Sequence, residues 1–467
     1  MSISENVSER KDSWLDRPVF GAGRVTWWTV AYAVVIVFIL FTRLWDLGAR
    51  GYDHDSSIHA WESWKLATGQ GYIHSPVFHG PFGYHFTALI YTLFGDNDYT
   101  GRLGAALFGI ALALLPLALK KWLGNKGTFA TLVLMAISPV MMFRSRFFRH
   151  DPFVAAFNLM LFIAIVRYLS MGKKKDLYLA AAALSLGFTA KENTFITYFI
   201  FGTFIFALFL WQWLIERRGN WRELPAFDLI MVLGTLILPL ASPFPIKLLG
   251  GDPVDYSSQA IMFSGAVFLG VLALSVALGL WWNWRQWLVC AGIFYVIFVP
   301  FFTTMFTNGQ GIATGMVGSL GYWLSQHGVK RGDQPWFYYL VLVPMYEFLP
   351  LTLAFGGGVA YVVKAFPALI RPRRPQPEAG AVTAPKVADG ETLEDGGVAE
   401  RDAAVPFVPF LAYWFVVSFV VYSWAGEKMP WLTMHIALPL IIMAGWTLGR
   451  LLEVDWREVR ARGGLLL

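Results

Sequence analysis

Acidic and imidazole side chains are concentrated in one hydrophilic stretch near the start of the chain, residues 43–102. Its centre, Gly51 to His59, reads Gly-Tyr-Asp-His-Asp-Ser-Ser-Ile-His, and Trp61, His74 and His79 follow. Ionisable groups are costly beside membrane hydrocarbon, so a membrane protein that keeps many of them there usually uses some for function. The alternative is a solvated loop that only connects two spans.

Asp53 and Asp55 flank His54 and are the first candidates for chemistry. A carboxylate at a membrane surface can act as a general base, bind a divalent cation or position a cationic group. The two carboxylates point the same way in an extended loop and diverge in a helix. Asp55 also precedes an amphipathic run, residues 56–68, which is typical of a helix N-cap.

A second polar cluster lies at residues 144–151. Arg144, Arg146 and Arg149 fall within six residues of one another, which favours the binding of a phosphate or another anion. Asp151 follows them and directly precedes Pro152, a pattern typical of a helix start. A capping role for Asp151 therefore stays open beside a catalytic one.

Two acid–base pairs stand between later apolar segments, Lys191 with Glu192 and Glu427 with Lys428. Each pair is compatible with a structural ion pair at the membrane edge. Lys191 is alternatively the point charge that holds a lipid phosphate.

Histidine is frequent in the first hydrophilic stretch, but its spacing is not diagnostic of a metal site. A bound metal needs two or three converging imidazoles or carboxylates, and neither His-Glu-x-x-His nor His-x-His occurs. A divalent metal ion at His59, His79 and Asp55 is one alternative, and the sequence indicates no other cofactor. The glycine-rich segment 303–336 lacks the Gly-Lys-Ser/Thr of a nucleotide loop and is predicted to be flexible, as in a lid.

The composition shows what must position these residues. The 467 residues are 56% hydrophobic and 15% charged, which excludes an ordinary soluble globule and predicts an all-α polytopic membrane bundle. About twelve apolar segments approach the length of a span: residues 25–42, 103–120, 128–143, 153–170, 177–190, 194–214, 226–242, 259–281, 287–304, 338–363, 405–424 and 431–449.

Basic residues gather at alternate connections between these segments, which marks those connections as cytoplasmic. The net charge of +6 therefore reports topology and does not indicate a nucleic-acid partner. Both termini are predicted to lie inside the cell, provided that residues 82–95 form an interfacial helix and do not cross. All the polar clusters described above then meet on the external face.

The chain divides by composition into five parts. Residues 1–24 are a cytoplasmic tail and 25–370 a membrane core, which includes the external loop 43–102. Residues 371–404 are rich in Pro, Gly, Ala and acids and are predicted to be a disordered cytoplasmic linker. A transmembrane hairpin (405–450) and a second cytoplasmic tail (451–467) complete the chain.

Several motifs occur in an order that resembles a known group of enzymes. They are the acidic first loop, Phe78-His79-Gly80-Pro81, Phe94-Gly95 to Arg102, Asp151-Pro152-Phe153, and Gly187 to Lys191. Over residues 40–200 the chain resembles the polytopic glycosyltransferases of the GT-C superfamily, near the protein O-mannosyltransferases and lipid A aminoarabinose transferases. More narrowly, it resembles a subgroup labelled as flippase-activity-associated proteins.

The resemblance implies roles for individual residues. Asp55 matches the presumed catalytic base and Asp151 the second catalytic aspartate. Lys191 matches a lysine suited to the donor phosphate, a role extended to Arg102, Arg146 and Arg149. Residues expected to contact substrate or acceptor are Asp53, His54, His59, Trp61, His79, Glu192, Glu427 and Lys428.

Two departures from the family pattern are visible. The usual Asp-Glu is Asp55-Ser56 here, and the Phe-Glu-Lys-Pro of the aminoarabinose transferases is Phe78-His79-Gly80-Pro81. The predicted function is an inverting, mannosyltransferase-like transfer of a hexose or pentose from a polyprenyl-phosphate donor. The acceptor is a protein, lipid or glycan on the external face of the plasma membrane. The alternative is a non-catalytic accessory of lipid-linked glycan flipping, or a transporter.

Overall fold

The computed structural model describes residues 14–19, 25–216, 219–255, 257–326, 328, 333–370 and 405–454, with the backbone alone at 365–370. Within these residues all regular structure is helical apart from one isolated bridge between Pro18 and Thr26, so the predicted all-α class is confirmed. The predicted linker, residues 371–404, lies outside the described residues, as does most of each predicted tail.

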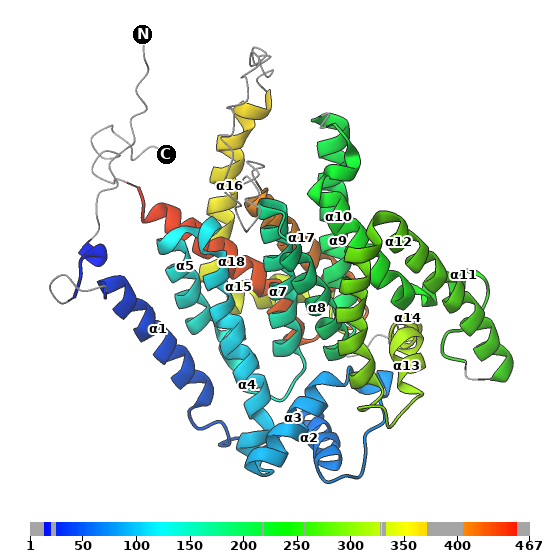
Figure 1. The fold of residues 1–467 in the computed structure, drawn as a ribbon. Coiled ribbons are helices and arrows are strands. Elements are labelled where there is room, and N and C mark those ends of the chain that lie inside the picture. Colours follow the sequence, from blue (N-terminus) through cyan, green and yellow to red (C-terminus); the bar gives the residue numbers. More distant parts are fainter. Residues whose placement is uncertain are drawn as a thin grey trace, which may run out of the picture.

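Eighteen α-helices are described, joined by short 3-10 and π turns (Figure 1). The first nine are α1 (Trp27–Leu44), α2 (His54–Ala67), α3 (Phe82–Phe94), α4 (Asp98–Leu114), α5 (Lys120–Ile137), α6 (Pro139–Arg144), α7 (Asp151–Met171), α8 (Lys174–Ala190) and α9 (Thr194–Leu210). The others are α10 (Pro225–Ile237), α11 (Pro243–Leu248), α12 (Ser258–Phe302), α13 (Gly311–Ala313), α14 (Ser319–Gln326), α15 (Tyr338–Tyr346), α16 (Phe348–Ile370), α17 (Phe407–Trp424) and α18 (Thr433–Leu451).

Seven described helical segments are long and apolar enough to cross a membrane, or eight if α15 and α16, bent by 99°, count as one span. Two of the seven contain a non-helical residue, Gly124 in α5 and Asn283 in α12. Asn283 has an extended backbone that interrupts α12, and the Trp287 ring beyond it lies against Gly279. The multi-pass membrane fold is thus established, while the twelve crossings remain a prediction.

Helices α7 and α18 form the centre of the bundle, and nearly nine-tenths of each span is buried. A helix that is apolar on all sides, as α7 is, belongs in such a core. Glycines let α18 approach α5 closely: a Cβ on Gly445 would lie 1.9 Å from Thr131 Oγ1, and one on Gly449 would lie 2.5 Å from Gly127 Cα. The C-terminal hairpin therefore belongs to the same core as the earlier helices.

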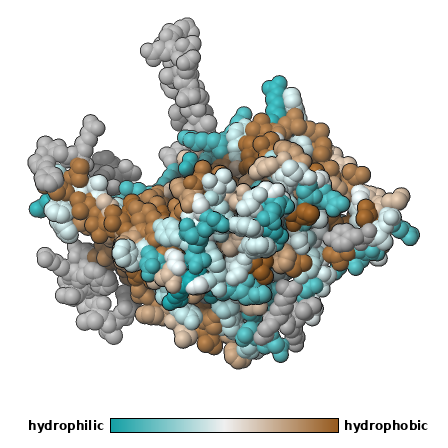
Figure 2. Space-filling view, turned by 90° about the horizontal axis from the view of Figure 1, so that it is seen from below, coloured by the Kyte–Doolittle hydropathy of each residue, from teal (hydrophilic) through white to brown (hydrophobic). Residues whose placement is uncertain are grey.

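Helices α2 and α3 lie across one end of the bundle (Figure 1). At 13 residues α3 is too short to cross the hydrocarbon, in agreement with the prediction for residues 82–95. The N-cap of α2 is Asp53, whose side chain accepts the Ser56 N–H at 2.7 Å, and not Asp55 as the sequence suggested. Seen from this end, hydrophilic residues cover much of the surface between apolar areas (Figure 2).

The lysine-rich connections lie at the opposite end. Tyr32 near the start of α1 donates to the Asn125 carbonyl, and Lys120 lies over the Tyr32 ring. Arg43 near the end of α1 instead caps the C-terminus of α5 through the carbonyls of Met135 and Ala136. Helices α1 and α5 thus run parallel, with positive charge at one end and the polar clusters at the other.

The described part of the segment 303–336 is partly helical. It contains α13, the π-turn η7 (Thr314–Gly318) and α14, and its start is bound to the first hydrophilic stretch. Thr304 Oγ1 donates to the Tyr72 carbonyl at 2.8 Å, and Thr314 Oγ1 lies 2.9 Å from His74 Nδ1. These long-range contacts hold Thr304 and Thr314 against the first hydrophilic stretch, and the flexibility expected for the segment stays a prediction.

Candidate active site

Asp151 is the first residue of α7 and is fully buried. Its carboxylate has two side-chain partners, the ammonium of Lys191 and the imidazole of His435. Its Oδ1 lies 3.1 Å from Lys191 Nζ and 3.1 Å from His435 Nε2, at the start of α18. A buried carboxylate is stable only when it is paired and hydrogen-bonded. Asp151 is therefore a fixed counter-ion, and the N-cap position of α7 is occupied by His150.

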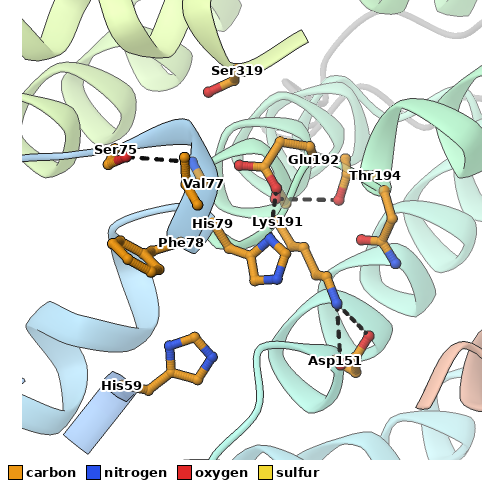
Figure 3. Close-up of polar contacts among 12 residues, drawn as sticks. His59, Ser75, Val77, Phe78, His79, Asp151, Lys191, Glu192, Thr194 and Ser319 are labelled. Carbon is orange, nitrogen blue, oxygen red and sulfur yellow. Dashed lines mark hydrogen bonds and ion pairs between the residues drawn. The ribbon is translucent and has the colours of Figure 1, made fainter. Parts of the chain in front are cut away.

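Lys191 and Glu192 are adjacent but do not pair with each other. Lys191 is the C-cap of α8 with extended backbone (φ −165°, ψ 148°), so successive side chains point to opposite sides. Glu192 Oε2 instead lies 3.0 Å from His79 Nδ1 (Figure 3). Burial raises the pKa of Glu192, but the hydrogen bond and charge of His79 outweigh it and hold that pKa below its ordinary value.

His79 is held in an unusual backbone conformation. Its φ of 75° and ψ of −175° fall in a region that is almost restricted to glycine. The next residue, Gly80, lies directly against the end of α8, where an added Cβ would be 2.3 Å from the Thr189 carbonyl oxygen. The His79 ring stacks on Trp323 of α14, with centroids 6.1 Å apart and planes inclined by 10°.

A cavity of about 200 Å³ opens beside this pair. Its polar wall contains Lys191, Glu192 and His79, which come from two connections far apart in the chain. The remaining walls come from α9, α14 and the connection between α17 and α18, and include Asn193, Phe195, Ile196, Leu320, Trp323, Gln326, Tyr422, Glu427 and Trp431. Three of the predicted external clusters therefore meet at one cavity.

Asp55 belongs to a neighbouring pair. Its carboxylate accepts from Arg149, whose guanidinium also lies 3.8 Å from Asp53 Oδ2 and 4.1 Å from the Trp431 ring centroid. Burial raises the pKa of Asp53, but hydrogen bonds from Ser56 and the charge of Arg149 outweigh it and lower that pKa. Asp55, Asp151 and Lys191 thus lie in adjoining clusters, but only Lys191 lines the cavity.

Three imidazoles meet behind the cavity. The ring centroid of His150 lies 4.6 Å from that of His59 and 5.5 Å from that of His79, and neither His150 nitrogen has a partner among the described residues. Tyr84 donates its hydroxyl to the Phe78 carbonyl at 2.5 Å, so it accepts from His59 Nδ1 at 2.8 Å. Burial, reinforced by nearby cationic or imidazole groups, holds the pKa of His59 and of His150 well below the ordinary value.

The described residues do not fit the metal site suggested by the sequence. No group of three His, Cys, Asp or Glu side chains among them could hold a metal ion. Of the predicted ligands, Asp55 is bound to Arg149, His79 to Glu192 and His59 to Tyr84.

Arg102 and Arg146 lie apart from the cavity. Arg146 donates to the carbonyls of Thr42 and Trp45 at the end of α1, both at 2.8 Å. Arg102 donates to the Asp98 and Arg50 carbonyls and covers the Tyr52 ring at 4.3 Å. They bind backbone carbonyls beside the end of α1, a common use of arginine at helix C-termini, and line a second cavity of about 410 Å³ there. The expectation that they contact a donor phosphate stays a prediction.

The other predicted contacts divide between the cavity and the surface. Glu427 lines the cavity, whereas Lys428 donates to the Ala425 carbonyl after α17. His54 is exposed at the start of α2, and Trp61 is exposed and stacks on Trp64.

Sequence reasoning missed five residues of this region as site residues, namely Asn193, Trp323, Tyr422, Trp431 and His435. His435 lies one helical turn after Trp431 at the start of the last span, which was the available signal. Arg144 was named only as part of its motif. Its guanidinium packs on Phe143, with no hydrogen bond or ion pair to any described residue.

Comparison with known proteins supports the resemblance. Residues 78–243 match the family described as dolichyl-phosphate-mannose-protein mannosyltransferase. No curated protein sequence matches the chain significantly.

Two solved structures share the fold. One is ArnT from Cupriavidus metallidurans bound to undecaprenyl phosphate, with 16% identity, a TM-score of 0.51 and coverage of 94% of this chain and 64% of that chain. The other is the archaeal oligosaccharyltransferase AglB from Archaeoglobus fulgidus in complex with an inhibitory peptide and a dolichol-phosphate. Its sequence identity is 12%, its TM-score is 0.52, and the match covers 94% of this chain and 51% of that chain. The chain thus spans about two thirds of ArnT and half of AglB, and the predicted GT-C resemblance is confirmed at the level of fold.

Proposed function

We propose that the protein transfers a sugar from a polyprenyl-phosphate donor to an acceptor hydroxyl, with inversion at the sugar carbon. The observation that carries this proposal is the position of Lys191: it is anchored by the buried Asp151 and lines a cavity with His79 and Glu192. The family match over residues 78–243 and the shared fold with ArnT and AglB support the same class of donor.

The chemistry follows from the charges at the site. Lys191 and Arg149 are each held by a carboxylate, so both cations are in place before the donor phosphate arrives. Fixed cations stabilise the negative charge that develops on a leaving phosphate, and they need no reorganisation during the reaction. Arg144 offers a third guanidinium, since it is not committed to another described residue.

A separate cavity of about 360 Å³ between α16, α17 and α18 is lined by apolar side chains such as Phe355 and Val416. We assign the prenyl chain to this groove. We further propose that the protein crosses the plasma membrane twelve times, with both termini in the cytoplasm and the site on the external face. The chain then has the five-part division expected from its composition and belongs to the flippase-associated subgroup.

The test uses purified protein in detergent with polyprenyl-phosphate-linked radiolabelled hexoses and pentoses. We expect wild-type protein to release polyprenyl phosphate and to label an added hydroxyl acceptor, and Lys191→Met to lower transfer at least about 100-fold. Lys65→Met removes a lysine from α2, away from the cavity, and should transfer normally. Failure of the wild type with every donor would contradict the proposal.

One feature favours a transporter as the second candidate. Broken spans with a buried ionisable residue are typical of transporter binding sites. Glu347 is buried at the 99° break between α15 and α16, where Oε1 accepts from Ser138 Oγ at 2.5 Å and Oε2 has no described partner. Lipid-linked sugar movement across liposomes that is lost in Glu347→Gln, without sugar transfer by the wild type, would favour this second function.

A further inference from the structure

We infer that His79, oriented by Glu192, is the general base that removes the proton from the acceptor hydroxyl. This inference rests on the proposed function and identifies the residue that activates the acceptor. The family resemblance implied that Asp55 is the general base and placed His79 and Glu192 only among the residues that contact substrate.

The geometry of the pair is that of a base and its orienting group. Glu192 Oε2 lies 3.0 Å from His79 Nδ1, so Nδ1 carries the proton and the lone pair is on Nε2. Glu192 is only 6% exposed and is therefore fixed, whereas the His79 side chain is 18% exposed and lines the cavity. In Figure 3 the second ring nitrogen of His79 points away from Glu192.

The backbone of His79 supplies an independent argument. A non-glycine residue in this region is strained and persists only where its surroundings impose it, which is most frequent at functional sites. Here the contact of Gly80 with the end of α8 and the stacking on Trp323 fix the ring. A glycine would satisfy this turn without strain.

Other charged and imidazole groups surround the His79 ring. The carboxylate of Asp55 accepts from Arg149, and Asp55 does not line the cavity. His59 and His150 pack near the His79 ring on the side of α2 and α7. Lys191 and Glu427 are charged groups that share the cavity wall with His79, and Glu427 is the remaining carboxylate that could compete as base.

His79 Nε2 takes the proton of the acceptor hydroxyl while that oxygen forms a bond to the anomeric carbon. The bond between the anomeric carbon and the phosphate oxygen breaks, and polyprenyl phosphate leaves with the electron pair beside Lys191. The imidazolium then returns its proton to water.

The experiment measures kcat/KM for sugar transfer between pH 5 and 9. We expect the wild-type kcat/KM to fall at acid pH as one group becomes protonated, and we call this fall the acid limb of the profile. His79→Gln should lose the acid limb and should be slower by about 10²–10⁴-fold. Glu192→Gln keeps a hydrogen-bond acceptor but loses the charge that stabilises the imidazolium formed during the step, so kcat should fall while KM for the donor stays unchanged. A purely structural role for Glu192 would not split kcat from KM in this way.

His79→Asn separates catalysis from folding. Asparagine tolerates a positive φ better than most residues and its amide N–H can still donate to Glu192, so this variant should unfold near the wild-type temperature while transfer is lost. The matched control is His85→Gln: His85 bonds to the Pro81 carbonyl nearby but does not line the cavity, so rate and acid limb should persist.

The outcomes separate this inference from the proposed function. An inactive wild type refutes the proposed function itself. An active wild type whose acid limb survives in His79→Gln, or disappears instead in Asp55→Asn or Glu427→Gln, overturns His79 as the base.

Discussion

The Nζ of Lys191 lies 3.1 Å from the Oδ1 of Asp151, and both side chains are almost completely buried. Removal of one partner from such a pair leaves an uncompensated charge, which typically costs about 3–5 kcal/mol. We therefore expect Asp151→Asn to lower both the unfolding temperature and transfer. Addition of Lys191→Met should restore much of the stability without restoring transfer. Thermal unfolding in detergent, with the exposed Glu453→Gln as control, checks both expectations.

Asp55→Asn tests whether this carboxylate holds Arg149. The amide keeps the size of the side chain but loses the charge that fixes the guanidinium, so we expect about a 100-fold loss of transfer through misplacement. The acid limb of the pH profile should remain. If the acid limb is lost in Asp55→Asn, Asp55 and not His79 is the general base.

Arg146→Met and Arg149→Met should fail in different ways. Arg146 binds carbonyls at the end of α1, and loss of charged hydrogen bonds costs about 1.5–3 kcal/mol each, so its variant should be less stable with an unchanged KM for donor. Arg149 sits between Asp55 and Trp431, so its variant should raise that KM. Equal effects on donor KM would contradict this division.

The buried histidines predict loss of stability in acid. The pKa of His59 and of His150 is well below the ordinary value in the folded protein, so the unfolded chain binds more protons below about pH 6.5. Stability is therefore full above about pH 6.5 and falls as the pH drops toward the folded pKa values. His150→Phe removes two nitrogens that have no described partner and should flatten this dependence in melting curves between pH 5 and 8. If the melting temperature of His150→Phe falls with pH as steeply as that of the wild type, His150 is not a source of the acid sensitivity.

Gly80→Ala tests the contact that fixes His79. An added Cβ would lie 2.3 Å from the Thr189 carbonyl oxygen, and relief of such overpacking typically costs about 1–3 kcal/mol. We expect a lower melting temperature and reduced transfer. Gly51→Ala, which has no atom within 4 Å of the added carbon, is the matched control and should melt like the wild type.

Apolar periodicity predicted the helical class, and it divided residues 259–304 into two segments on either side of Asn283, where α12 is interrupted. It could not predict the bend at Glu347, inside the predicted segment 338–363, because Glu347 is bound there by Ser138, which is distant in sequence. The N-cap of α2 was placed two residues late, because Asp53 and Asp55 are equivalent as sequence signals.

The site was predicted as a set of residues but not as a set of partners. Charge placement indicated that the clusters meet on one face, which the cavity confirms for Lys191, His79 and Glu427. Whether Lys191 pairs with its neighbour Glu192 or with Asp151 depends on the extended backbone at one residue. Likewise, an arginine that caps α1 and one that faces the site look identical in the sequence.

The hydroxyl of Tyr339, in the bent segment α15, bonds to both the N–H and the carbonyl of Met429, each at 3.0 Å. Met429 lies two residues before Trp431, which lines the cavity. The phenol of Tyr339 therefore joins the broken span to the connection that forms one wall of the cavity.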